Sequence, residues 1–108
     1  MKLLSRIEEI VLLAILRLGA DAYGLTICRE VGRLTEKEWL VGAIYAPLAR
    51  LHKNGHVEIL PGPFGADSGE SRRIYYRVTP QGLEALAEAR RITARGWHGL
   101  ALPSREKA

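Results

Sequence analysis

Two histidines and a glutamate in the middle of the chain come closest to a metal site. His52 and His56 stand four residues apart with Glu58 close behind, and imidazole and carboxylate groups are zinc ligands. Asn54-Gly55 would break a helix between the two histidines, and no third ligand is evident in the sequence. We therefore expect no metal here, and the sequence suggests no cofactor elsewhere.

Cys28 is the single cysteine in 108 residues and the other candidate for covalent chemistry. No histidine or second cysteine stands near it to activate its thiol, so we expect a small core residue. One cysteine cannot form a disulfide within the chain, which fits a reducing cytoplasm. The sequence also lacks a phosphate-binding loop, so we expect that the protein is not an enzyme. The cysteine content leads us to expect a cytoplasmic protein.

A second group of candidate site residues is rich in arginine and lies in the segment SRRIYYRVT, which begins at residue 71. If this segment is a strand, alternation places Arg73, Tyr75 and Arg77 on an outward face and Ile74, Tyr76 and Val78 on the buried face. The outward face suits DNA phosphates or a minor groove, and Arg72 near the adjoining loop could also reach them. The alternative is an ordinary solvated face. The chain has 16 Lys+Arg against 12 Asp+Glu and a formal charge of +4, a mild bias toward an anionic partner.

The preceding helical segment, residues 40–53, has a face that could approach DNA. Its apolar stripe consists of Leu40, Val41, Ile44, Leu48 and Leu51. The opposite face carries Gly42, Ala46, Ala49 and Lys53, flanked by Ala43 and Arg50. Small residues would let the helix backbone approach the floor of a groove, while Arg50 and Lys53 would reach phosphates. The alternative is an ordinary exposed helix face. The candidate DNA-binding residues are Gly42, Ala43, Tyr45, Ala46, Arg50, Lys53, Arg72, Arg73, Tyr75 and Arg77.

Pro47 lies within this helical segment. A proline in a helix interior removes one backbone hydrogen bond and crowds the preceding turn, at a cost of roughly 3 kcal/mol. We therefore expect a helix that is kinked or begins late. The outward face also lacks Asn, Gln or Arg in its first turns, so sequence specificity would come from Tyr45, Arg50, the following hairpin or DNA shape.

The first helix is predicted to begin near Ser5, because Ser5 and Glu8 form a capping-box pattern. Its core-facing stripe is Ile7, Ile10, Val11, Ala14, Ile15 and Leu18, and Gly19 is placed to end the helix with a left-handed backbone. Apolar Leu12, Leu13 and Leu16 fall on other faces of the same helix. A helix that is apolar nearly all round must be covered on several sides, which predicts a homodimer; the alternative is that the last helix covers it within one subunit.

A second helix is predicted over residues 23–33, and a last helix begins after Thr79, with Pro80 at its first position. Leu83 and Leu86 should pack on the core. Ile92 and Trp97 lie farther along and are candidates for the dimer interface, with Trp97 packed on its own subunit as the alternative. Residues 97–108 are predicted to be a frayed or disordered tail. The apolar run at residues 10–16 falls short of the roughly 20 residues that span a bilayer, so no membrane segment is expected.

The order of these elements predicts the fold class. Three helices, a strand pair around the Gly- and Pro-rich loop PGPFGADSGE and a final helix make a mainly α protein with a small β-hairpin. This is the layout of a winged helix-turn-helix, with a three-helix core, a two-stranded wing and a C-terminal dimerisation helix. We expect a single DNA-binding domain over residues 1–96, including the last helix from about residue 80.

Three segments carry a pattern shared with one protein family: AYGLTICREV, GAIYAPLARLHKNGHVEIL and SRRIYYRVTPQG. On these segments, from Arg6 to about Ala89, the chain resembles the PadR-like transcriptional regulators of bacteria. The resemblance implies a dimeric repressor that binds double-stranded DNA near its own or a neighbouring gene. It also implies dimerisation through the first and last helices, where some members bind small planar compounds.

The chain departs from the family pattern at Leu40, Pro47 and Ala49, where a Ser cap, a Thr or other helix former, and a polar residue are usual. These positions bear on how the third helix would read DNA. Pro47 and the lack of Asn, Gln or Arg on the outward face motivate an alternative function, a winged-helix protein-interaction or small-molecule-sensing module with weak DNA affinity.

Overall fold

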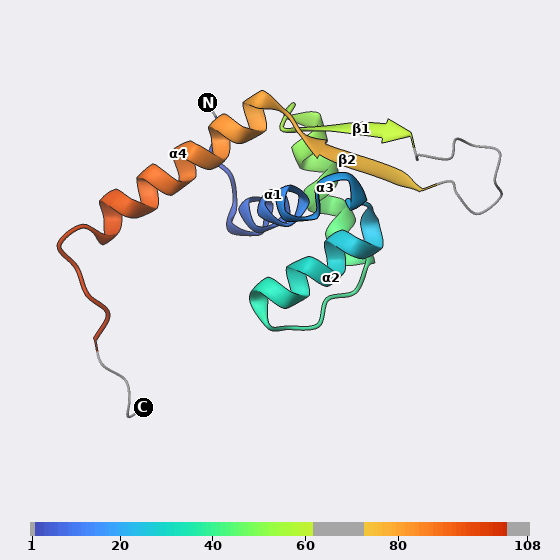
Figure 1. Ribbon diagram of the computed structural model, residues 1–108. Coiled ribbons are helices and arrows are strands. Elements are labelled where there is room, and N and C mark those ends of the chain that lie inside the picture. Colours follow the sequence, from blue (N-terminus) through green and yellow to red (C-terminus); the bar gives the residue numbers. More distant parts are fainter. Residues whose placement is uncertain (1, 62–72, 104–108) are drawn as a thin grey trace.

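The computed structural model describes residues 2–61 and 73–103 of the chain. In chain order its elements are α1 (Arg6–Leu18), the short 3-10 helix η1 (Gly19–Asp21), α2 (Gly24–Thr35), α3 (Gly42–Lys53), β1 (Val57–Pro61), β2 (Ile74–Val78) and α4 (Pro80–Trp97) (Figure 1). This order confirms the predicted winged helix-turn-helix. Arg72, the predicted contact near the end of the wing, lies outside the described residues. No helix in the described ranges is long and apolar enough to cross a membrane.

Helix α1 begins where its capping box predicts. The Ser5 hydroxyl accepts a hydrogen bond from the Glu8 amide at 3.2 Å, and the Glu8 carboxylate accepts one from the Ser5 amide at 2.9 Å. These two bonds satisfy backbone donors that have no partner inside the helix. At the other end Gly19 has the positive φ that was predicted, 62°, but its ψ of -125° lies outside the left-handed helical region.

Helix α1 occupies the centre of the molecule and contacts α2, α3, β2 and α4. The buried cluster consists of Val11, Leu12, Ala14, Ile15, Ala22, Ile27, Cys28, Val31, Ile44, Leu48, Leu51, Val57, Tyr76 and Leu86. Leu12 is 0% exposed within its own chain, so its predicted place at a dimer interface is wrong. The helices around α1 cover a wider arc than one apolar stripe, whereas Leu13 and Leu16 stay 40% and 45% exposed.

The wing is a two-stranded antiparallel sheet in which Val57 pairs with Val78 and Pro61 with Ile74. The chain just before α2 also joins it: the Tyr76 amide donates to the Ala22 carbonyl at 2.9 Å, and Tyr23 forms an isolated bridge with Tyr75. Because this third segment covers one side of β2, the strict alternation predicted for β2 is wrong. Tyr75, expected to face outward, is buried, and Ile74, expected to be buried, is exposed.

Helix α3 begins at Gly42 and continues through Pro47, so the prediction of a late start is wrong. Pro47 is buried with Ile44, Leu48 and Leu51 on the inner face of the helix. Leu40 was predicted to belong to the same inner stripe. It precedes the helix, in the connection from α2, and is 82% exposed.

Helix α4 starts as predicted, with the Thr79 hydroxyl accepting from the Gly82 amide at 3.0 Å and Pro80 in the first turn. It meets the rest of the molecule through Gly82, Ala85 and Leu86, and then projects away from the three-helix core (Figure 1). Leu86 packs as predicted, but Leu83 is half exposed because it lies to one side of this contact line.

Candidate nucleic-acid interface

The outer face of α3 is open. Gly42, Ala43, Ala46, Ala49 and Lys53 are all exposed, opposite the buried positions of the same helix. The predicted helix face therefore exists, and its small side chains would let a groove wall come close to the helix backbone.

Arg50 flanks this face and forms an ion pair with Glu8 of α1. Its Nε donates to the Glu8 Oε2 at 2.7 Å, which joins α3 to the start of α1. Burial alone raises the pKa of the Glu8 carboxyl, but hydrogen bonds from Arg50 and Ser5 outweigh it, so the pKa lies below its ordinary value. The sequence indicated the capping role of Glu8 and not this ion pair, because the two residues are 42 positions apart.

Arg77 lies on the outward side of the wing as predicted. Its Nε donates to the Glu58 Oε2 at 2.6 Å across the hairpin, and the two residues are direct partners in the strand register. Both side chains are exposed, and ion pairs of this kind contribute little to stability, about 0–1 kcal/mol. Arg77 can therefore leave the Glu58 carboxylate and bind another anion at a small cost in free energy.

Arg73, just before β2, lies over an aromatic ring that the sequence did not single out as a site residue. Its guanidinium carbon is 4.5 Å from the centroid of the Tyr23 ring. The Tyr23 ring packs in turn against Tyr75, with ring centroids 5.3 Å apart and planes tilted by 60°. The Tyr23-Gly24 pair at the start of α2 belongs to the segments that carry the family resemblance, but its contact with β2 depends on the fold.

Tyr45 is half exposed on the first turns of α3, and its hydroxyl lies against Gly24 of α2. A Cβ atom at position 24 would collide with that hydroxyl unless the Tyr45 side chain moved aside, so the two helices approach closely at this point. Beside this contact is a pocket of about 430 Å³, which we name the wing-root pocket. It is lined by Tyr23, Gly24, Leu25, Val41, Tyr45, Arg73, Ile74 and Tyr76.

The residues considered for catalysis are separated in the fold. Cys28 is buried as predicted, and its thiol donates to the Trp39 carbonyl at 3.1 Å. His52 is exposed on α3, whereas His56 is buried at the start of the wing with no hydrogen-bond partner for its Nδ1 among the described residues. Their positions show no shared site.

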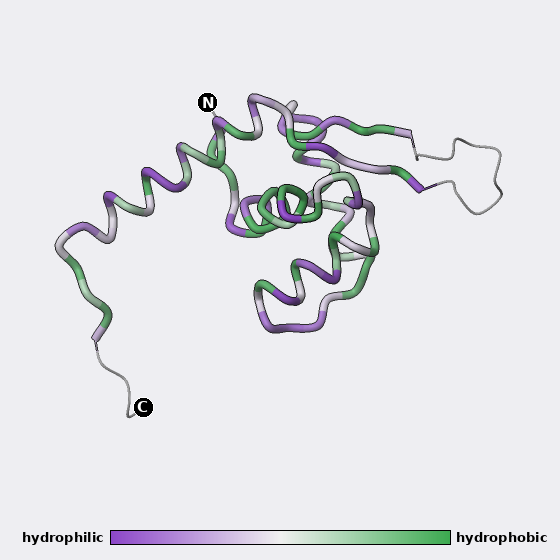
Figure 2. The backbone as a smooth tube through the Cα atoms, in the orientation of Figure 1, coloured by the Kyte–Doolittle hydropathy of each residue, from purple (hydrophilic) through white to green (hydrophobic). Residues whose placement is uncertain are grey.

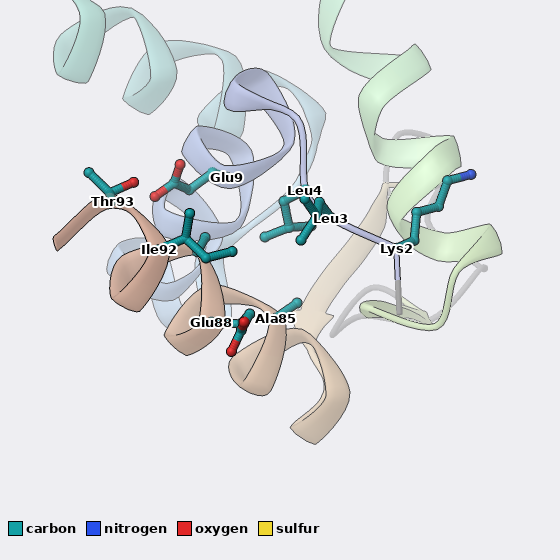
Figure 3. A pocket seen from close by; sticks show the side chains of 9 residues that line it. Lys2, Leu3, Leu4, Glu9, Ala85, Glu88, Ile92 and Thr93 are labelled. Carbon is teal, nitrogen blue, oxygen red and sulfur yellow. The ribbon is translucent and has the colours of Figure 1, made fainter. Parts of the chain in front are cut away.

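A second exposed region lies on α1, α4 and the N-terminal segment. Leu13, Leu16, Ile92 and Trp97 all have large exposed apolar surfaces, and Figure 2 shows hydrophobic residues interspersed with hydrophilic ones along the projecting part of α4. Near Ile92, the N-terminal segment and α4 enclose a small pocket of about 130 Å³, lined by Lys2, Leu3, Leu4, Glu9, Ala85, Glu88, Ala89, Ile92 and Thr93 (Figure 3). This surface coincides with the predicted dimer interface except at Leu12.

Comparison with known proteins gives one family. Residues 12–88 match the family described as "Transcriptional regulator PadR-like family". A search of curated protein sequences found no match.

Solved structures of transcriptional regulators share the fold. A transcriptional regulator from Clostridium thermocellum is 24% identical, with a TM-score of 0.63 over 89% of this chain and 90% of its own. RosR from H. salinarum is also 24% identical, with a TM-score of 0.65 over 91% of this chain and 81% of its own. BpsR from Bordetella bronchiseptica is 18% identical, with a TM-score of 0.62 over 96% of this chain and 73% of its own.

Proposed function

This chain belongs to the PadR-like family of transcriptional regulators, and from that premise we propose that it is a dimeric repressor of its own or a neighbouring gene. The observation that carries the proposal is the open outer face of α3, with Arg73 of the wing in one pocket with Val41 and Tyr45 at the start of this helix. Helix α3 enters a major groove, where Ala43, Ala46 and Ala49 offer methyl groups to thymine methyls. Lys53 and the wing arginines bind flanking phosphates.

A dimer would place two copies of α3 on one duplex. The exposed apolar residues of α1 and α4, namely Leu13, Leu16, Ile92 and Trp97, support a second copy as the group that covers them. Two copies related by a twofold axis would read a roughly palindromic site, with half-sites about one helical turn apart.

Fluorescence anisotropy tests the proposal. The labelled duplex upstream of the protein's own gene is compared with a random duplex across a salt series. We expect a clear preference for the upstream duplex near physiological salt, affinity that falls steeply with salt, and repression of that promoter by the protein in transcription in vitro. Equal, weak binding to both duplexes would count against an autoregulating repressor.

A module with weak DNA affinity is the second candidate, and the ion pair of Arg50 with the buried Glu8 favours it. Arg50 is bonded to Glu8, which leaves Lys53 as the remaining lysine or arginine on α3. Pro47 also withholds one backbone hydrogen bond from this helix. Under this hypothesis Pro47→Thr raises DNA affinity in the same anisotropy assay, and an unchanged affinity removes its main support.

A small planar ligand at the dimer interface completes the proposal. The structural neighbour BpsR is described as having its DNA binding regulated by 6-hydroxynicotinic acid, a planar compound. Trp97 is 46% exposed on the same surface and would report such binding by a change in fluorescence. If planar aromatic acids change the fluorescence equally in a Trp97→Phe variant, the ligand site is not at this interface.

A further inference from the structure

Three elements meet at the wing-root pocket, and one of them brings a charged group that suits a phosphate. Arg73 enters just before β2, Tyr23 just before α2, and Tyr45 from the start of α3. A guanidinium group is always charged and matches phosphate geometry, and phenol hydroxyls can donate hydrogen bonds. The described residues that line the pocket include no carboxylate.

Arg73 is held in place before any ligand arrives. Its guanidinium carbon stacks over the Tyr23 ring at 4.5 Å, and that ring is itself fixed against the buried Tyr75. The backbone beneath is tied as well, through the Tyr76 amide and the Ala22 carbonyl. An arginine whose rotamers are already restricted loses less conformational entropy on binding, which favours a tighter contact.

We propose that the wing-root pocket binds one phosphodiester group of the DNA backbone, with Arg73 supplying the charge and Tyr23 acting as a positioning residue that presets the guanidinium. The proposal rests on the DNA-binding function proposed above and adds Tyr23 to it. The pocket adjoins the start of α3 at Val41 and Tyr45, so the phosphate is one beside the groove that α3 enters. Tyr75 has a supporting role from below and no contact with DNA.

A double-mutant cycle in the full-length protein separates positioning from independent contacts. Anisotropy with the upstream and random duplexes is measured for Tyr23→Leu, Arg73→Ala and the double variant across a salt series. We expect Arg73→Ala to lower the salt slope by about one. Tyr23→Leu should weaken binding by about two- to fivefold, the range of an exposed cation–π contact, and the double variant should bind no more weakly than Arg73→Ala.

Three controls sharpen the cycle. Tyr23→Phe keeps the ring and should retain most of the affinity. Arg73→Lys keeps the charge and should retain the salt slope. Arg77→Ala lies on the same wing without an aromatic partner among the described residues, so its loss should add to that of Tyr23→Leu. Thermal unfolding of each variant shows that it is folded.

Separate outcomes identify what fails. Additive losses in Tyr23→Leu and Arg73→Ala would refute the positioning role, and a loss in Tyr23→Phe as large as in Tyr23→Leu would assign the effect to the hydroxyl instead. In one outcome the wild type binds DNA as expected and Lys53→Ala weakens that binding, while the Tyr23 and Arg73 variants bind like the wild type. In that case only the phosphate pocket is wrong. If the wild type shows no salt-dependent binding, the proposed function fails and this inference fails with it.

Discussion

Glu8 illustrates how one side chain can serve two elements. Its carboxylate caps α1 through Ser5 and also bonds Arg50 of α3, so the start of one helix fixes the position of the other. A buried carboxylate is stable as an anion only when such partners offset its desolvation. The pair therefore holds α3 against the core, whatever else Arg50 binds.

Replacing Glu8 with Gln should destabilise the protein. At neutral pH we expect the free energy of unfolding to fall by about 1–3 kcal/mol, because Arg50 loses its charged partner. The folded-state pKa of Glu8 is below the ordinary 4.5, so this stabilisation is complete above pH 4.5 and disappears as pH falls through the lower folded-state value. Urea unfolding of wild type and Glu8→Gln at neutral and acidic pH measures both effects.

The neighbouring Glu9 provides the control for this comparison. It pairs with exposed Arg6 at 3.6 Å, so Glu9→Gln should change stability by less than about 0.5 kcal/mol. A Glu8→Gln loss that is as large at pH 3 as at pH 7 would mean that ionisation of Glu8 is not its source.

At the scale of elements, α4 depends on a close contact with the end of the α3–β1 connection. A Cβ atom at Gly82 would collide with the His56 backbone carbonyl, and a backbone atom cannot rotate away as a side chain can. The Thr79 amide donates to the same carbonyl at 3.0 Å. Helix α4 can therefore dock in this position only with glycine at residue 82.

Two glycines of α4 allow a matched test of this contact. We expect Gly82→Ala to lower the free energy of unfolding by about 1–3 kcal/mol through overpacking. Gly96→Ala, with nothing within 4 Å of its added Cβ, should raise it by about 0.4–1 kcal/mol because alanine favours the helix. Thermal or urea unfolding measures both, and equal shifts in the same direction would contradict the docking argument.

The sequence predicted elements where local signals were strong. Capping residues and helical periodicity placed the start of α1 at Ser5 and the start of α4 at Thr79, and both were confirmed. It failed where distant segments decide burial. Tyr75 is buried because Tyr23 packs on it, and Leu12 is buried because several helices surround α1. Neither contact can be predicted from the spacing of neighbouring residues.

The same limit applies to the candidate site. The arginines and the open face of α3 could be predicted from residue type and alternation, and whether they contact DNA stays a prediction. The stacking of Arg73 on Tyr23 and the bond between Arg50 and Glu8 could not be predicted, because each joins residues far apart in the chain.

At the scale of the whole molecule, the projecting α4 allows the proposed dimer to be tested. Leu13→Glu and Ile92→Glu place charges on the proposed interface and should convert a dimer to a monomer, which sedimentation velocity measures. The monomer should also bind the upstream duplex more weakly, since each protomer supplies one α3.

Leu40→Glu is the matched control for assembly. Leu40 is also an exposed leucine, but it lies between α2 and α3, away from the proposed interface. This variant should sediment like the wild type. A wild type that is already monomeric at micromolar concentration, or an Ile92→Glu variant that remains dimeric, would place the interface elsewhere.

The hydrogen bond from the Tyr76 amide to the Ala22 carbonyl has a consequence for how the chain folds. It closes a loop of chain that contains α2, α3 and β1, so this bond forms only after β2 has come back to the segment before α2. Contacts between residues so distant in sequence slow the search for the native state. The helix-turn-helix and the wing should then form one cooperative unit, and the Tyr76 amide should exchange its hydrogen with solvent only when that whole unit opens.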